Sequence, residues 1–215
     1  MLLAIDTSTA IAGLALYDGS VSAELTWHSG RNHSVELMPQ TERLLDLRGL
    51  DPSAIEAVAV ATGPGSYTGL RVGISAAKAL CLALGVPVVG IPTLDVLAEP
   101  HRLNAIPVRA VLDAGRKRYA TALYATVDGR FRRIGEVEGK RMAEIIAGLE
   151  GDTLLCGDLA ECAGADLPDR VKIASPASSL RRASFLAEMA WREYSEGRAT
   201  APEQVEAFYL NREDG

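Results

Sequence analysis

The chain has 215 residues, of which 48% are hydrophobic and 23% are charged, and its formal net charge is −6. Such a large apolar fraction argues against an intrinsically disordered chain, and the length allows one domain of ordinary size or two small ones. The acidic balance argues against unaided binding of nucleic acid, because Lys and Arg supply most of a protein's affinity for phosphates.

The cysteines and the first residues indicate the compartment. Three cysteines without C-x-x-C spacing are typical of free thiols under reducing conditions, with neither a disulfide framework nor a zinc site. The opening MLLAID has no cationic region and its apolar run ends at Asp6, so we expect no signal peptide. The longest uncharged run, 79–94, is broken by Gly85, Pro87 and Pro92 and does not predict a membrane span. We expect a cytoplasmic protein.

The first half predicts a buried strand that ends on an acid, then a hairpin with Asp18-Gly19 as its turn, a helix, and a second buried strand. A glycine-rich loop, a helix and a short strand follow, and Thr93 is the expected cap of a further helix. The expected strands lie at 2–6, 55–62 and 86–91, and the expected helices at 33–47 and 70–84.

The same order of elements begins again in the second half. Asp113 ends a strand and precedes Tyr124 by 11 residues, as Asp6 precedes Tyr17, although one such match is also compatible with chance. The remaining expected elements are a hairpin turn at Asp128-Gly129, helices at 140–149 and 178–197, and a strand at 153–158. This internal repeat predicts two tandem α/β halves, residues 1–100 and 101–215.

The plan resembles the actin-like ATPase superfamily (the ASKHA, ribonuclease H-like fold), in which an opening acidic turn faces phosphate and metal. Here the turn is Asp6-Thr7-Ser8-Thr9. A carboxylate at a strand end can hold hydrated Mg²⁺, and glycines before a helix N-terminus favour anions. The candidate nucleotide-binding residues, in a pocket of vestigial type, are Asp6, Thr7, Ser8, Gly63, Gly65 and Ser66.

The alternative for this site is purely structural. The hydroxyls can satisfy a tight turn, and the loop GPGSYTGLRVG can pack on its own sheet. The loop is neither G-x-x-x-x-G-K-[ST] nor G-x-G-x-x-G, and no lysine lies where it meets the helix. None of the three histidines has metal-ligand spacing and no G-x-S-x-G occurs, so we predict neither a metal site nor a catalytic residue.

Two helices carry the candidate partner interface. The helix at 33–47 has an apolar stripe at helical spacing, and the helix at 70–84 is apolar nearly all round. Such a helix is either sandwiched in a core or half-buried against a partner. The candidate interface residues are Leu37, Met38, Thr41, Leu44, Leu45, Gly73, Ala76, Ala77 and Leu80.

Five segments resemble the TsaB (YeaZ) family of tRNA threonylcarbamoyladenosine (t⁶A) biosynthesis proteins. They are AIDTST, RNHSVELMP, ATGPGSYTGLRVGISAAKAL, GVPVVGIPTLDVLA and the terminal VEAFYLNRED. The resemblance implies a non-catalytic subunit of the bacterial complex that modifies adenosine 37 of tRNA. In the related catalytic subunit TsaD, an H-x-x-x-H pair binds metal; here Thr93 and Leu97 stand at those positions.

The resemblance also implies the partners. The two helices would bind TsaD, and the same surface would pair two copies of this chain in isolation. The ATPase TsaE would join the complex, TsaC would supply the adenylate substrate, and tRNA would be bound only through the complex. We expect no cofactor for this chain alone, with ATP or ADP confined to the complex with TsaD and TsaE.

One block departs from the family pattern. The second acid usually lies in a sequence similar to DARxxEVY, but here DAGRKRYA has Gly115 in place of the arginine, which Arg116 or Arg118 would have to replace. Two other functions stay open on the sequence alone. One is an ATP-dependent kinase of the actin-like class, which needs a complete nucleotide site. The other is a glycoprotease-like (M22-type) metallopeptidase, which needs metal ligands.

Overall fold

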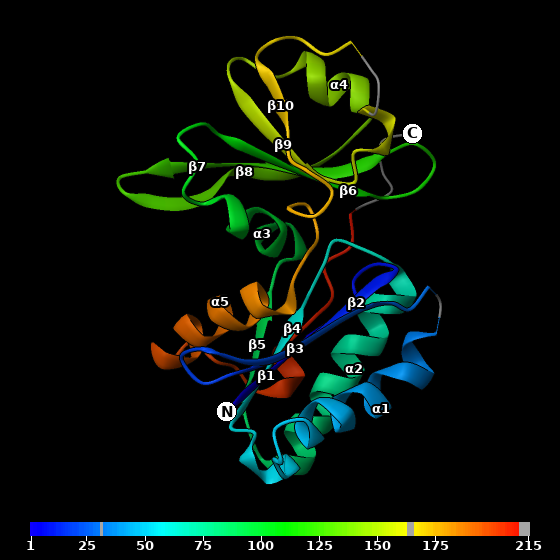
Figure 1. The fold of residues 1–215 in the computed structure, drawn as a ribbon, viewed down its shortest axis with the longest axis vertical. Helices are drawn as coiled ribbons and strands as arrows, with labels where there is room; N and C mark the ends of the chain where they lie inside the picture. The colour runs from blue at the N-terminus through cyan, green and yellow to red at the C-terminus, as the bar shows by residue number, and fades with distance from the viewer. Residues whose placement is uncertain (31, 163–165, 211–215) are drawn as a thin grey trace. The chain divides into compact units, whose positions relative to one another are not determined.

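The computed structural model describes residues 1–30, 32–162 and 166–210 of the chain. These residues form two compact units, each with its own five-stranded sheet (Figure 1). Unit 1 comprises Met1–Val96 and Arg181–Tyr209, and unit 2 comprises Leu97–Leu180 together with Leu210.

The sheet of unit 1 has the strand order β3-β2-β1-β4-β5. Its strands are β1 (Leu2–Asp6), β2 (Ile11–Tyr17), β3 (Val21–His28), β4 (Ala57–Ala61) and β5 (Val88–Ile91). The first three form an antiparallel meander, whereas β1, β4 and β5 run parallel. Both faces of the central strands are buried, which explains why β1 and β4 are apolar at nearly every position.

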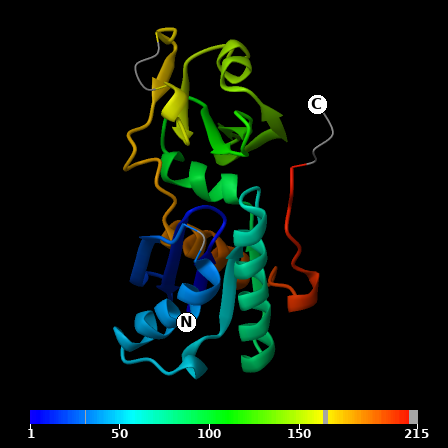
Figure 2. The same ribbon diagram turned by 90° about the vertical axis from the view of Figure 1, so that its right-hand side faces the viewer.

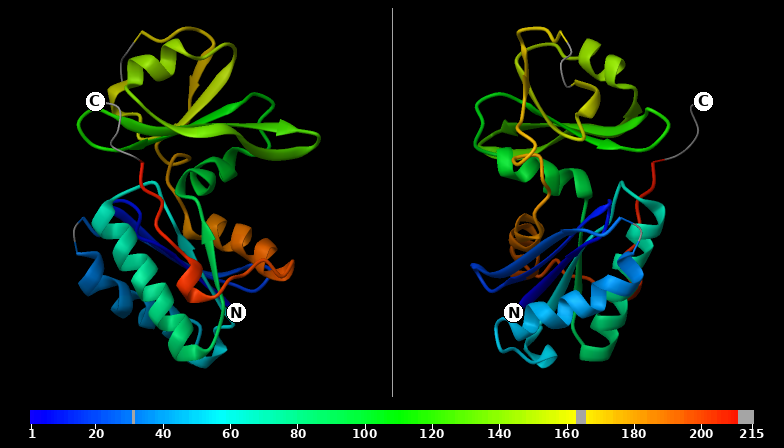
Figure 3. Two further views of the ribbon diagram at one scale, coloured as in Figure 1. Left: turned by 180° about the vertical axis from the view of Figure 1, so that it is seen from behind. Right: turned by 45° about the vertical axis from the view of Figure 1, so that its right-hand side comes forward.

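Helices cover both faces of this sheet (Figures 1 and 3). Side chains alternate along β1, so Leu3 and Ile5 face α1 (His33–Asp46) and α2 (Tyr67–Leu84). Leu2 and Ala4 face α5 (Ala183–Ser195) on the other side. Figure 2 shows the red C-terminal segment with η4 (Pro202–Gln204) running beside α2.

The two ends of α2 have clear local causes. The helix begins at Tyr67, three residues before the expected start, because the Ser66 hydroxyl accepts a hydrogen bond from Gly69 N at 3.2 Å and caps it. It ends at Gly85, which adopts the left-handed conformation (φ +69°) that glycine tolerates best. The predicted helix at 33–47 is confirmed as α1, one residue shorter.

Unit 2 repeats the strand plan with the order β10-β9-β6-β7-β8. Its strands are β6 (Val108–Asp113), β7 (Tyr119–Val127), β8 (Arg130–Lys140), β9 (Thr153–Gly157) and β10 (Val171–Ile173). The other elements of the chain are α3 (Thr93–Ala98), α4 (Met142–Ala147), η1 (Pro52–Ala54), η2 (Glu99–His101) and η3 (Ala160–Cys162). The helix expected at 178–197 is the shorter α5, and β10 was not expected.

The repeat predicted from the order of elements is confirmed, because β6 to β10 pair as β1 to β5 do. The equal acid-to-tyrosine spacing, however, is coincidental. Asp6 pairs with Gly13, seven residues on, whereas Asp113 pairs with Tyr119, six residues on. Tyr17 and Tyr124 therefore occupy non-equivalent positions in their hairpins.

The predicted boundary after residue 100 needs correction. The contacts divide the chain between Val96 and Leu97, and they return Arg181–Tyr209 to unit 1. The physical reason is α5, whose Leu186, Ala187 and Ala190 are fully buried against the apolar face of the first sheet. Without α5 that face would lie open to water, so the second half is not a continuous domain.

Within the described residues, α2 is the one helix that is long and apolar enough to cross a membrane. Its inward side chains, among them Leu70, Ile74 and Cys81, lie in the core of unit 1. That is the arrangement of a helix packed on a sheet in a globular domain.

Candidate functional site

The turn that follows β1, here called the DTST turn (residues 6–9), is closed by its own hydrogen bonds. Asp6 Oδ1 accepts hydrogen bonds from Ser8 N at 2.9 Å and from Ser8 Oγ at 2.6 Å. The exposed fractions of Asp6, Thr7 and Ser8 are only 2%, 2% and 0%. The acid predicted to face a ligand is therefore used inside the fold.

A buried arginine neutralises this acid. Arg181 Nε donates to Asp6 Oδ2 at 3.2 Å, and Arg181 Nη2 donates to the hydroxyl of Thr9. Both charged side chains are almost completely buried. Sequence reasoning missed Arg181, since nothing local distinguishes it from the exposed Arg182 beside it.

The glycines after β4 allow the backbone of their loop to pack directly against the backbone of the DTST turn. A Cβ added to Gly65 would lie 2.2 Å from Ser8 O, and one added to Gly69 would lie 2.1 Å from Thr7 O. Ser66 N donates to Ser8 O at 2.7 Å, and Thr7 Oγ1 donates to Gly69 O at 2.8 Å. The space that a phosphate would need beside these glycines is filled by the DTST turn.

The other end of the loop is held by Thr93 and by the C-terminal segment. Gly63 N donates to Thr93 Oγ1 at 3.0 Å, and Thr93 N donates to Gly63 O at 2.8 Å. Phe208 N donates to Thr62 O at 2.8 Å, and a Cβ on Gly63 would lie 2.3 Å from Phe208 O.

The residues at the positions of the H-x-x-x-H pair do not fit a metal ion. The hydroxyl of Thr93 is buried and accepts the hydrogen bond from Gly63 N, and the side chain of Leu97 has no donor atom.

Of the six predicted nucleotide-site residues, only Ser66 is exposed and Gly65 half-buried. Asp6, Thr7, Ser8 and Gly63 present no surface to a ligand in this structure. The hydrogen bonds of the DTST turn described above are all made within the fold, as the structural alternative predicts. The arrangement is a tightly packed junction of β1, α2 and the segment that begins α5.

Most of the predicted interface residues also need correction. Leu37, Thr41, Leu44, Leu45, Gly73 and Ala77 are buried in the core of unit 1 and are not accessible to a partner. Ala76 and Leu80 are partly buried against that core, and only Met38 is exposed. The error has a physical cause, since the apolar stripe of an amphipathic helix is the side that faces its own sheet.

The exposed sides of α1 and α2 carry other apolar residues. Val35 and Met38 on α1 are 69% and 46% exposed, and Leu82 on α2 is 66% exposed. Although α2 has only two charged residues, Arg71 and Lys78, no more than a third of it is buried. The two helices lie side by side (Figures 1 and 3), and we call their exposed apolar residues Val35, Met38 and Leu82 the exposed helical layer. Exposed apolar residues mark a protein–protein interface where they form a contiguous patch.

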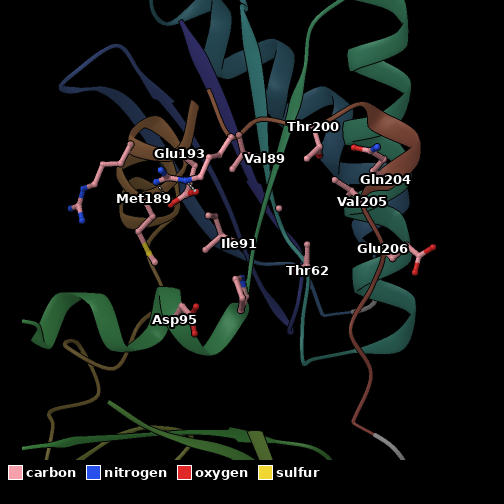
Figure 4. Close-up of a pocket in the computed structure, with 14 residues that line it drawn as sticks. Thr62, Val89, Ile91, Asp95, Met189, Glu193, Thr200, Gln204, Val205 and Glu206 are labelled. Atoms are coloured by element: carbon pink, nitrogen blue, oxygen red, sulfur yellow. Dashed lines mark hydrogen bonds and ion pairs between the residues drawn. The ribbon is translucent and has the colours of Figure 1, made fainter. Parts of the chain in front are cut away.

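A recess of about 520 Å³ lies along the outer edge of β5 in unit 1, between α5 and the segment around η4 (Figure 4). Apolar side chains such as Val89, Ile91 and Met189 line its wall, with charged groups around them. Arg198 is paired with Glu193 and Glu196, so its charge is already compensated. None of the predicted nucleotide-site residues lines this recess.

Taken together, two tandem α/β units of the same strand order, the first opening with an acid-bearing turn, define a protein of the actin-like ATPase (ASKHA) class. Comparison with known proteins agrees with this assignment of the class. Residues 27–175 match the family model of TsaD, tRNA N6-adenosine threonylcarbamoyltransferase. The structure of YeaZ from Pseudomonas aeruginosa superposes with a TM-score of 0.82 at 27% identity, covering 97% of this chain and 99% of that one.

Two relatives identify the family. The tRNA threonylcarbamoyladenosine biosynthesis protein TsaB of Escherichia coli is 30% identical over 223 residues, which cover 97% of this chain and 94% of the relative. TsaB of Bacillus subtilis is 36% identical over 134 residues, 62% of this chain and 58% of the relative. The chain belongs to the TsaB family.

Proposed function

We propose that this chain is the non-catalytic subunit of the bacterial complex that forms t⁶A in tRNA, and that it binds and supports the catalytic subunit TsaD. The family membership supplies the pathway. The observation that carries the subunit role is the exposed helical layer, in which Val35, Met38 and Leu82 are exposed to solvent on two adjacent helices.

A non-catalytic role agrees with the closed DTST turn. A kinase or transferase of the actin-like class needs a carboxylate free to bind hydrated metal or to orient phosphate. Asp6 instead accepts hydrogen bonds from Ser8 and pairs with Arg181. We therefore assign ATP or ADP to TsaD and the ATPase TsaE, which would join this pair in the cytoplasm, and we assign tRNA to the assembled complex.

The exposed helical layer also supports self-association. With TsaD absent, the same apolar side chains would pair two copies of the chain, since both events cover the same surface. Sedimentation of the chain alone and with TsaD should show a homodimer replaced by a heterodimer, and added TsaD should compete with self-association.

The test is a reconstituted t⁶A assay with TsaC, TsaD and TsaE, with and without this chain, using Met38→Glu and Leu82→Glu variants. A charge at the centre of an apolar interface should weaken TsaD binding at least about tenfold and lower t⁶A formation in parallel. The matched control is Leu103→Glu in unit 2, where a 90% exposed leucine lies outside the helical layer. Full activity without the chain, or equal losses in all three variants, would contradict the proposal.

A further inference from the structure

The connection between β6 and β7, here called the basic turn (residues 114–118), has an unusual backbone. Gly115, Arg116 and Lys117 are consecutive and all left-handed, with φ of 81°, 55° and 59°. Two hydrogen bonds close the turn, from Ala114 N to Arg118 O at 2.9 Å and from Arg118 N to Gly115 O at 3.1 Å. Non-glycine residues adopt this conformation at a cost in free energy, and such positions concentrate at functional sites.

The two strained residues are both cationic and both exposed. Within the described part of the chain, neither Arg116 nor Lys117 makes a hydrogen bond or an ion pair. The fold thus holds two adjacent positive charges in water with their hydrogen-bonding capacity unused.

The surroundings fix this turn in place. Arg118 Nη2 donates to Gly139 O at 2.6 Å, tying the turn to β8, and the register places Lys140 opposite Tyr119 beside it. The carboxylates beside the turn already accept hydrogen bonds or form ion pairs. Asp113 Oδ1 accepts from Gly115 N at 2.7 Å, Asp158 Oδ2 accepts from Asp113 N at 2.9 Å, and Glu138 pairs with Lys140 and Arg109.

The acidic charge of the chain lies mainly in the other unit. Residues 1–96 and 181–209 contain 9 Lys and Arg against 14 Asp and Glu, whereas residues 97–180 contain 12 of each. The overall acidity that argued against contact with nucleic acid is therefore a property of unit 1. A local cationic surface on unit 2 is not opposed by the net charge of its own unit.

We propose that the basic turn contacts the phosphate backbone of the substrate tRNA when the t⁶A-forming complex binds it, an inference that rests on the proposed function. Arg and Lys contacts to phosphates position a nucleic acid without reading its sequence. Two unpaired cations on a rigid turn lose little conformational freedom on binding, and they add to the affinity of the complex without making the isolated chain an RNA-binding protein.

The decisive variant is Arg116→Asn with Lys117→Asn, because asparagine tolerates the left-handed conformation and removes only the charges. In the complete complex, the KM for tRNA should rise about tenfold with kcat little changed. The slope of the logarithm of the tRNA binding constant against the logarithm of salt concentration should become less negative by about one to two. The charge-conserving exchange Arg116→Lys with Lys117→Arg should leave the KM for tRNA, kcat and the salt dependence of binding at their wild-type values.

The matched control is Arg130→Asn with Arg132→Asn, which removes the same charge at the opposite end of the β7–β8 ladder. These variants should change the KM for tRNA less than about twofold. Equal losses in both pairs would reveal only general electrostatic attraction and overturn the proposal, as would an unchanged KM in the basic-turn variant. Failure of the proposed function would look different, since the wild-type chain would then neither bind TsaD nor stimulate t⁶A formation.

Discussion

Arg181, which lies just before α5, forms a buried ion pair with Asp6 at the end of β1, 175 positions away in the chain. This pair joins the first strand of unit 1 to the helix that covers its sheet. It also neutralises the acid that the sequence predicted to face a ligand. Asp6 is therefore a structural residue here, and its removal is a test of stability before it is a test of activity.

Removing one partner of this pair should destabilise the fold strongly. Asp6→Ala or Arg181→Ala would leave an uncompensated buried charge, which costs about 3–5 kcal/mol of unfolding free energy. Urea unfolding followed by circular dichroism measures the change. Asp6→Ala with Arg181→Met, which removes both charges, should recover part of the loss. If the double variant were as unstable as the sum of the single ones, the pair would not be coupled.

Gly69→Ala should destabilise the protein, although replacing glycine with alanine usually stabilises a helix. Alanine normally stabilises a helix interior by about 0.5–1 kcal/mol relative to glycine. Here the added Cβ would lie 2.1 Å from Thr7 O, so the variant should lose about 1–3 kcal/mol in urea unfolding. Gly151→Ala is the control, because no atom lies within 4 Å of its added Cβ, and it should change stability by less than about 0.5 kcal/mol.

Glutamate substitutions at two leucines near the end of α1 should distinguish a core position from a surface position. Leu45 is 5% exposed and Leu47 is 60% exposed, so Leu45→Glu buries a charge whereas Leu47→Glu leaves it in water. We expect Leu45→Glu to lower the unfolding free energy by about 3 kcal/mol or more, and Leu47→Glu to leave it nearly unchanged. A stable, monomeric Leu45→Glu variant would instead restore Leu45 to the partner interface.

The buried Cys156 should make stability fall at high pH. Burial raises the pKa of its thiol from 9.0 to about 12. In the unfolded chain the thiol ionises near its ordinary pKa, so above about pH 9 the unfolded state binds fewer protons than the folded state and is favoured as pH rises. Between pH 9 and 10.5 the wild type should lose up to about 1.4 kcal/mol per pH unit more than Cys156→Ala, measured by urea unfolding. Parallel slopes for the two proteins would show that the thiol is not protected by burial.

The predictable part of the fold came from local patterns. Apolar runs, the Asp18-Gly19 turn and the order strand–hairpin–helix predicted both sheets, because strand and turn signals depend on a few neighbouring residues. The short β10 and the start of α2 at Tyr67 were missed. A three-residue strand has too short a pattern to detect, and the Ser66 cap acts before the helical periodicity begins.

The site was harder to predict than the fold. Residue types pointed to the DTST turn and the glycine loop, but they could not distinguish a ligand cradle from close packing, since both need small residues beside a turn. Helical periodicity likewise found the stripe through Leu37 and Leu44, which is the side that faces the sheet. Val35 on α1 and Leu82 on α2 lie on the exposed sides of their helices, so a search for the apolar stripe did not find them.

The sequence by itself determined the two α/β repeats, the ASKHA class and the TsaB family, because these depend on local patterns and short motifs along the chain. Tertiary structure alone decided what the motifs do. It paired Asp6 with Arg181, filled the space beside Gly65 and Gly69 with the DTST turn, and divided each interface helix into a buried and an exposed side. The physical reason is that burial and charge pairing depend on contacts between residues far apart in the chain, which no local pattern of residue types specifies.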